Sequence, residues 1–132
     1  MNRYRAFGVT AALAIAVVAS PLASQAALPS GFDVELMEGF VEVQPDGARW
    51  ARFRYVMPAL AEGAAFDKVQ QDFAVLCNGA AVPMLDAAGE EVSQVVVSLM
   101  DKPLEFGQSD PGTVQYFEVF TLREGRCIWE EF

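Results

Sequence analysis

The C-terminal stretch of the chain has the clearest pattern of apolar and polar positions. Residues 115–122 carry aromatic and β-branched side chains on both of their alternating faces, which is typical of an interior β-strand. Glu124 and Gly125 follow, and the glycine suits the positive φ of a tight hairpin loop. Residues 127–132 return as a second strand, so the chain is predicted to end in a β-hairpin.

A second hairpin is indicated nearer the start of the chain. Residues 32–43 alternate between apolar and acidic positions, and the alternation changes phase near Gly39, which predicts a β-bulge there. Residues 44–47 read Gln-Pro-Asp-Gly, a sequence that suits a type I turn. Residues 48–57 are predicted to be the return strand, and Pro58 ends it.

The middle of the chain changes to a helical period. Apolar side chains in residues 66–77 fall on one stripe of a helix, and Cys77 belongs to that buried stripe. Asn and Gly at residues 78–79 tolerate the left-handed conformation, so the helix is predicted to end there. Residues 80–85 are expected to be extended, and the unalternating run at 95–100 predicts a strand covered on both faces.

These elements predict a single α+β domain over residues 27–132. The expected sheet is antiparallel with five to six strands, in the order β-β-α-(β)-β-β-β, and one helix packs across a face. A chain of this length is enough for one hydrophobic core and too short for two domains.

Residues 1–26 predict a secretory signal peptide rather than a part of the fold. Arg3 and Arg5 form a short basic head, followed by an apolar run at residues 6–19 that is shorter than the roughly 20 residues needed to cross a bilayer. Small residues occupy the cleavage-site positions ahead of Ala27. We therefore expect export by the general secretory route, to the periplasm or beyond.

Charge narrows the range of partners. The chain has nine Lys and Arg against 18 Asp and Glu, a net charge of −9. Seven of the basic residues and all 18 acidic ones lie after residue 26, so the expected mature chain has a net charge of −11. Nucleic acid and anionic membrane surfaces repel such a chain, so neither nucleic acid binding nor membrane insertion is expected after cleavage.

The chain has two cysteines, Cys77 at the end of the predicted helix and Cys127 at the start of the last strand. The oxidising periplasm favours a disulfide between them. Thiol chemistry is the weaker interpretation, because the sequence has no Cys-x-x-Cys motif and no histidine to act as a base for a cysteine nucleophile.

Three stretches are specific enough to compare with known families. They are residues 76–79 (Leu-Cys-Asn-Gly), residues 95–107 (VVVSLMDKPLEFG) and residues 116–132, which carry Cys-Ile-Trp-Glu near their end. These stretches resemble a family of small exported alphaproteobacterial proteins that is classed as a domain of unknown function. The resemblance implies export and a shared fold, and it implies no activity and no catalytic residue.

Residues that could carry chemistry are few. A histidine-free chain with one disulfide offers little to zinc or copper, so no metal and no cofactor is expected. Asp101, Glu105 and Asp110 share the longest irregular stretch, and they could divide acid and base roles if their environments separate their pKa values. A solvated acidic loop is the simpler interpretation, and the spacing of these residues matches no calcium-loop signature.

Arg49, Arg52 and Arg54 lie within six positions, and Trp50 shares a strand face with the last two. On an acidic protein this group could bind an anion or an acidic partner, because guanidinium groups bind carboxylates through two hydrogen bonds and tryptophan is a common interface anchor. The simpler interpretation is pairing across the hairpin with glutamates of the first strand. These glutamates are Glu35, Glu38 and Glu42.

The sequence therefore favours a non-catalytic periplasmic binding or accessory module for a protein partner or a small ligand. The alternative is a small carboxylate-dependent hydrolase or lyase-type enzyme. The absence of histidine, the paired cysteines and the small size favour the first interpretation. A concave pocket with converging carboxylates would favour the second.

Overall fold

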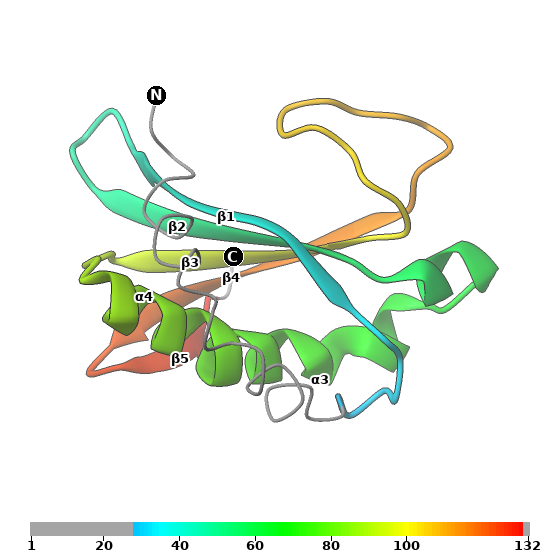
Figure 1. Cartoon of the computed structure of the whole chain (residues 1–132), viewed down its shortest axis with the longest axis horizontal. Helices are drawn as coiled ribbons and strands as arrows, with labels where there is room; N and C mark the ends of the chain where they lie inside the picture. The colour runs from blue at the N-terminus through cyan, green and yellow to red at the C-terminus, as the bar shows by residue number, and fades with distance from the viewer. Residues whose placement is uncertain (1–27, 131–132) are drawn as a thin grey trace, which may run out of the picture.

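The computed structural model describes residues 28–130, which form a five-stranded sheet with a long helix across one face (Figure 1). Neighbouring strands in the sheet follow the order of the chain, β1-β2-β3-β4-β5. The strands are β1 (Glu35–Val43), β2 (Arg49–Val56), β3 (Gln94–Met100), β4 (Gln115–Arg123) and β5 (Arg126–Trp129). The predicted α+β class, with five strands and a helix on one face, is confirmed.

One pair of neighbouring strands is parallel, so the sheet is mixed. β2 and β3 run in the same direction, whereas the other three pairs are antiparallel as expected. The helix lies between β2 and β3 in the chain and carries it back across the sheet. Such a crossover is the usual connection between two parallel strands.

The crossover contains a short 3₁₀ turn and one continuous helix built from three segments. These elements are η2 (Pro58–Glu62), α3 (Phe66–Leu76), the π-helical η3 (Cys77–Ala81) and α4 (Val82–Ala88). The predicted helix end at residues 78–79 is wrong, because neither residue has a positive φ. Residues 80–85, expected to be extended, are helical, and the helix ends at Gly89 with φ +68°.

The π-helical turn follows from the spacing of the buried side chains. Val69, Phe73, Cys77, Ala81 and Leu85 recur every four residues, and each is at most 1% exposed. Because an α-helix has 3.6 residues per turn, a four-residue repeat drifts around it by about 40° at every step. The wider π turn takes up an extra residue and limits this drift. The second half of the helix can therefore keep facing the sheet.

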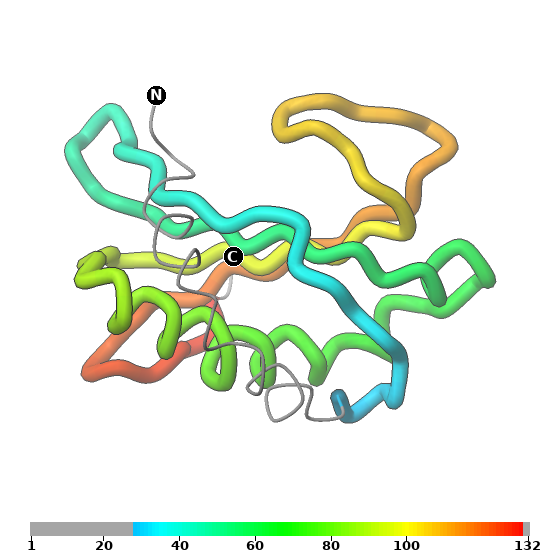
Figure 2. The backbone as a smooth tube through the Cα atoms, viewed as in Figure 1, coloured from blue at the N-terminus to red at the C-terminus, as the bar shows by residue number. Residues whose placement is uncertain are grey.

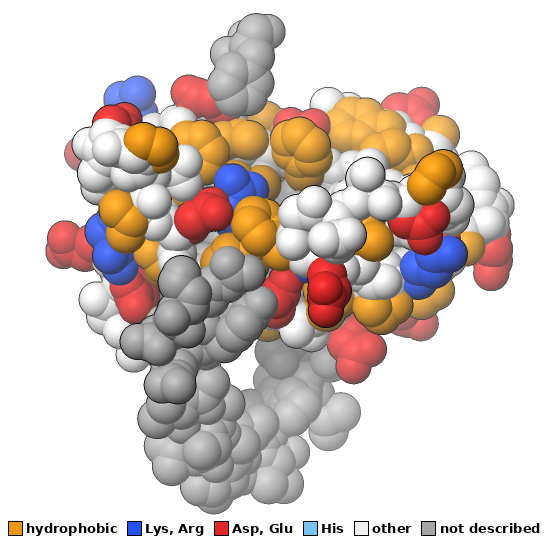
Figure 3. Space-filling model, turned by 90° about the horizontal axis from the view of Figure 1, so that it is seen from above, with side chains coloured by type: hydrophobic (Ala, Val, Ile, Leu, Met, Phe, Trp, Pro, Cys, Tyr) orange, Lys and Arg blue, Asp and Glu red, His pale blue; other side chains and the backbone are white. Residues whose placement is uncertain are grey.

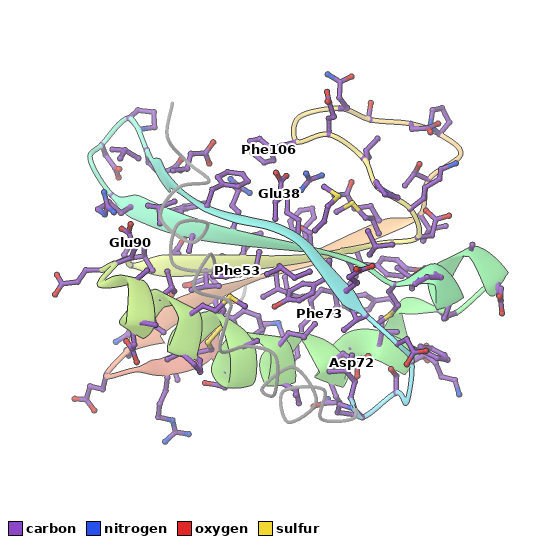
Figure 4. The ribbon with its side chains drawn as sticks, in the orientation of Figure 1. Glu38, Phe53, Asp72, Phe73, Glu90 and Phe106 are labelled. Carbon is purple, nitrogen blue, oxygen red and sulfur yellow. A yellow bond between two sulfur atoms is a disulfide. The ribbon has the colours of Figure 1, made fainter. Side chains whose placement is uncertain are left out.

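The hydrophobic core lies between the helix and the sheet. Phe53 of β2 and Phe73 of α3 lie there and are fully buried (Figure 4). Burying side chains of this size contributes about 2–3 kcal/mol each. Residues 95–100 of β3 are all buried, which confirms the prediction of a strand covered on both faces.

The first hairpin is present, with its bulge displaced from the predicted position. The backbone N–H of Gly47 donates to the carbonyl oxygen of Gln44 at 2.8 Å and closes the expected turn. The register shifts between Leu36 and Glu38, not at Gly39. Leu36 packs against the core and Glu38 is ion-paired on the opposite face. In a regular strand, residues two positions apart lie on the same face. Leu36 and Glu38 can lie on opposite faces only because the bulge adds an extra residue between them.

The last hairpin and the disulfide are also as predicted. Glu124 and Gly125 form the turn with φ of +51° and +76°. Cys77 and Cys127 form a disulfide with an S–S distance of 2.04 Å, which joins η3 to β5. Asn78 supports this junction, because its Oδ1 accepts a hydrogen bond from the N–H of Cys127 at 3.0 Å. Residues 131–132 of the predicted return strand lie outside the described residues.

The first described residues are fixed to the helix. The carboxylate of Asp72, which is 1% exposed, accepts hydrogen bonds from the N–H and the Oγ of Ser30 at 3.0 and 2.5 Å. Leu28, two residues before Ser30, is buried in the core. The predicted signal peptide and its cleavage site fall in residues 1–27, outside the described part of the chain. Within residues 28–130, no helix has the length and apolar character needed to cross a membrane.

Candidate functional site

We call the side of the sheet that points away from the helix the open face. The loop of residues 101–114 rises from the end of β3 and returns to β4 above this face (Figures 1 and 2). At its base, the N–H of Asp101 donates to the carbonyl oxygen of Val114 at 3.1 Å. The Oδ1 of Asp101 accepts the N–H of Val114 at 3.0 Å. Both ends of the loop are therefore held together where they leave the sheet.

Phe106 is one of the loop residues that contact the open face. Its ring meets the ring of Phe40 edge-on, with 5.1 Å between centroids. The guanidinium carbons of Arg52 and Arg54 lie 5.0 and 5.6 Å from its centroid, in the range of cation–π contacts. Figure 4 shows Phe106 above the sheet, near Glu38.

Arg54 holds the loop against the open face. It is 3% exposed and is ion-paired with Glu38 on the neighbouring strand. Its Nη2 also donates to the carbonyl oxygen of Leu104 at 2.6 Å. A buried guanidinium is tolerated when it is paired and hydrogen-bonded in this way. Arg54 therefore fixes the loop and has little capacity left for a ligand.

Arg52 has the same neighbours but a different environment. Its side chain is 23% exposed, and its Nε donates to Oε1 of Glu42 at 2.8 Å. The guanidinium carbon lies 5.8 Å from the ring centroid of Trp50 and 5.0 Å from that of Phe106. Its terminal nitrogens make no hydrogen bond to another described residue. Of Arg52 and Arg54, Arg52 is thus the one that keeps free donors.

Arg49 does not join this group. It is ion-paired with Glu90, and its Nε donates to the carbonyl oxygen of Glu91 at 3.0 Å. These contacts tie the start of β2 to the segment that precedes β3. Arg52 and Arg54 pair with Glu42 and Glu38 of β1, across the hairpin, as the simpler interpretation of the sequence described. Arg49 pairs outside the hairpin, with Glu90.

A hollow of about 190 Å³ lies beside Arg52, under the loop. Its polar lining comes from Arg52, Arg54, Ser98, Gln108 and Gln115. Its other lining residues are Val96, Phe106, Gly107 and Phe117. No Asp or Glu is among these described lining residues. Ligand pockets are commonly 300–1,000 Å³, so this hollow fits a small molecule or a single side chain.

Exposed hydrophobic side chains continue from the hollow over β4 and β5. Phe117 is 60% exposed and Ile128 is 44% exposed. They share the open face, since Phe117 lies opposite Ser98 and Ile128 lies opposite Thr121 in the register. Figure 3 shows this face from above, with hydrophobic, basic and acidic side chains interspersed. A partner that covered these two side chains would gain apolar burial.

The three loop carboxylates considered for catalysis lie outside the hollow. Asp110 accepts hydrogen bonds from the N–H of Gly112 at 2.9 Å and from the hydroxyl of Thr113 at 3.1 Å. These bonds, together with nearby Lys102, hold the pKa of Asp110 below its ordinary value. Asp101 closes the base of the loop, and Glu105 is exposed. Asp101 and Asp110 therefore stabilise the shape of the loop.

The sequence indicated part of this site and missed the rest. It placed Trp50 and Arg52 on one strand face, as observed. Phe106 and Phe117 were not identified, although an aromatic residue in a polar loop and a strand with two apolar faces were signals that could have found them. Ser98, Gln108 and Gln115 carry no such signal. Within the described chain, no group of three or more His, Cys, Asp or Glu is placed to hold a metal ion.

Comparison with known proteins places the chain in a family. Residues 9–132 match a family of unknown function (DUF6497), which leaves out the first eight residues alone. No curated protein and no solved structure matches the chain. The resemblance to a family of unknown function is confirmed, and the chain belongs to the DUF6497 family.

Proposed function

We propose that this protein is a non-catalytic binding or accessory module of the periplasm, which binds a protein partner or a small ligand through its open face. The observation that carries the proposal is the difference between the two faces of the sheet. The helix, the disulfide and the large core lie on one side. The hollow, the free donors of Arg52 and the exposed ring of Phe117 lie on the other.

Export is part of the proposal. The Cys77–Cys127 disulfide supports it, because disulfides form and persist in oxidising compartments. The predicted signal peptide at residues 1–26 would supply the route. The intact mass of protein recovered from the periplasm tests this step. A chain starting at Ala27 is expected, and recovery of the full-length chain from the cytoplasm would overturn it.

The hydrolase or lyase alternative gains no support from the described residues. Asp101, Glu105 and Asp110 do not converge on the hollow, and Asp110 is held in its ionised form. A general acid needs the opposite, a carboxyl whose pKa is raised toward neutrality.

Mild crosslinking of the protein at its native level in the periplasm, followed by affinity purification and mass spectrometry, tests the binding function. We expect one partner in near-equal amount. Phe117→Ser should abolish its recovery, because this ring is 60% exposed and its loss removes contact area without disturbing the core.

Val75→Ser provides the matched control, since Val75 is a 39% exposed hydrophobic residue of α3. A partner that is retained in this variant and lost in Phe117→Ser supports binding through the open face. Retention in both variants would place the interface elsewhere and overturn the proposal.

A further inference from the structure

We propose that the hollow beside Arg52 binds a carboxylate group, carried by a small organic acid or by the C-terminal end of a peptide. This inference rests on the proposed function, because it names the ligand chemistry of the same face. It assigns the contact to Arg52 and leaves Arg54 and Arg49 their structural roles.

The guanidinium of Arg52 is held in place without using its terminal N–H groups. Glu42 accepts from Nε, and the rings of Trp50 and Phe106 flank the group at 5.8 and 5.0 Å. A guanidinium presents its N–H groups as a planar fork that matches the two oxygens of a carboxylate. Because the side chain is already restrained, a ligand meets donors that lose little further conformational freedom.

The other polar groups of the hollow suit a singly charged anion. Ser98, Gln108 and Gln115 bring neutral groups that can donate hydrogen bonds, and no carboxylate is among the described lining residues. Arg54 also lines the hollow, and its charge is paired with Glu38. Glu42 offsets part of the charge of Arg52, which favours a carboxylate over a doubly charged phosphate. The net charge of −11 expected for the mature chain acts from further away and is screened over about 8 Å at physiological ionic strength.

The body of the ligand is limited by size and by the neighbouring rings. A volume of about 190 Å³ leaves room for a compact group. Phe106 lines the hollow, and Phe117 lines it with its ring 60% exposed. An apolar or aromatic group attached to the carboxylate would bury part of that ring. The structure therefore favours an aromatic or branched aliphatic carboxylate.

Titration of the full mature protein with benzoate, followed by amide chemical shifts in NMR spectra, tests this site. We expect saturable shifts at residues that line the hollow, with a dissociation constant of about 0.1–10 mM for so small a ligand. Benzamide has the same shape without the charge, and it should bind at least about tenfold more weakly.

Variants of Arg52 distinguish the effect of its planar guanidinium from the effect of its positive charge. Arg52→Gln should weaken benzoate binding at least about tenfold, and Arg52→Lys should weaken it severalfold, because lysine keeps the charge and loses the planar fork. Arg126→Gln removes one positive charge from an exposed residue at the β4–β5 turn and should leave binding unchanged. Phe117→Ala serves if the Arg52 variants do not fold, and it should weaken binding severalfold.

N-Acetylphenylalanine and its amide, used as mimics of a chain end, distinguish the two sources of the carboxylate. Binding of the acid about tenfold tighter than benzoate would assign the site to a peptide C-terminus, and equal or weaker binding would assign it to small acids. Either ratio supports the inference. Equal benzoate binding by wild type and Arg52→Gln, or no saturable shift in the hollow, would overturn it. A partner still captured in a Phe117-dependent way would then leave the proposed function intact.

Discussion

The guanidinium of Arg54 donates a hydrogen bond of 2.6 Å to the carbonyl oxygen of Leu104, 50 positions further along the chain. The same group is ion-paired with Glu38 and is 3% exposed. One buried side chain thereby joins β1, β2 and the loop over the hollow. The position of the loop, and with it the shape of the candidate site, depends on this contact.

Replacing Arg54 with Met should lower the free energy of unfolding by about 3 kcal/mol, because it leaves the half-buried carboxylate of Glu38 without its cation. Urea unfolding followed by circular dichroism measures the change. Arg52→Met is the control, and it should cost about 1 kcal/mol or less because that ion pair is more exposed. The double variant Glu38→Gln with Arg54→Met should lose less than the sum of the single losses. Strict additivity would show that the two side chains do not interact.

Removing the disulfide should be the most damaging change on the helix side. Cys77 and Cys127 are 50 positions apart, and in the chain-entropy model a link of this span stabilises the folded state by about 4 kcal/mol. We expect Cys77→Ala with Cys127→Ala to lower the urea midpoint accordingly. Adding a reductant should lower the midpoint of the wild type and leave that of the double variant unchanged. Alkylation of two thiols in the untreated protein would contradict the disulfide itself.

Tyr55 should make stability depend on alkaline pH. Burial raises the pKa of its phenol above the ordinary value of about 10. Above that pH the unfolded chain releases the phenol proton while the folded chain keeps it. The contribution of Tyr55 to the free energy of unfolding is therefore complete below about pH 10 and is lost as the pH rises further. Tyr55→Phe should lose less stability than wild type between about pH 9 and pH 11 in urea unfolding.

The same variant tests the hydroxyl of Tyr55 at neutral pH. This oxygen is buried with no hydrogen-bond partner among the described residues. Removing an unsatisfied buried hydroxyl should raise the free energy of unfolding by about 1 kcal/mol. A loss of stability at neutral pH would show instead that the hydroxyl is hydrogen-bonded in solution.

Two glycines of the long helix should respond in opposite ways to alanine. Gly79 lies inside η3 without a positive φ, and an added Cβ would meet no atom within 4 Å. Gly79→Ala should therefore raise the free energy of unfolding by about 0.5–1 kcal/mol. Gly89 ends the helix at φ +68°, so Gly89→Ala should lower it by about 1 kcal/mol. Thermal melting compares the two, and a destabilised Gly79→Ala protein would show that the π turn needs glycine.

Most of the architecture could be predicted because local patterns determine it. The aromatic and β-branched run before Glu124 specifies a strand, and the Gln-Pro-Asp-Gly stretch at residues 44–47 specifies a turn. The helix predicted from the sequence was too short for a physical reason. The Asn-Gly pair at residues 78–79 resembles a helix end, but both residues stay inside the helix. The buried positions continue past this pair with a spacing of four residues, through Cys77 and Ala81.

The candidate site could be predicted only in outline. Alternation along β2 placed Trp50, Arg52 and Arg54 on one face. It could not separate the two arginines, because their different burial depends on Phe106 and Leu104, which the loop brings from about 50 positions away. Contacts of this kind arise from tertiary packing and leave no periodic signal in the sequence.

The π-helical turn at Cys77–Ala81 holds one residue more than a regular α-helix needs. Deleting one residue there, Gly79 for example, would change the spacing from Cys77 to Ala81 from four residues to three and restore the period of a regular α-helix. Deleting one residue elsewhere in the helix would instead rotate everything beyond it by about 100° around the helix axis. The segment should therefore tolerate the loss of one residue inside the π turn and not outside it.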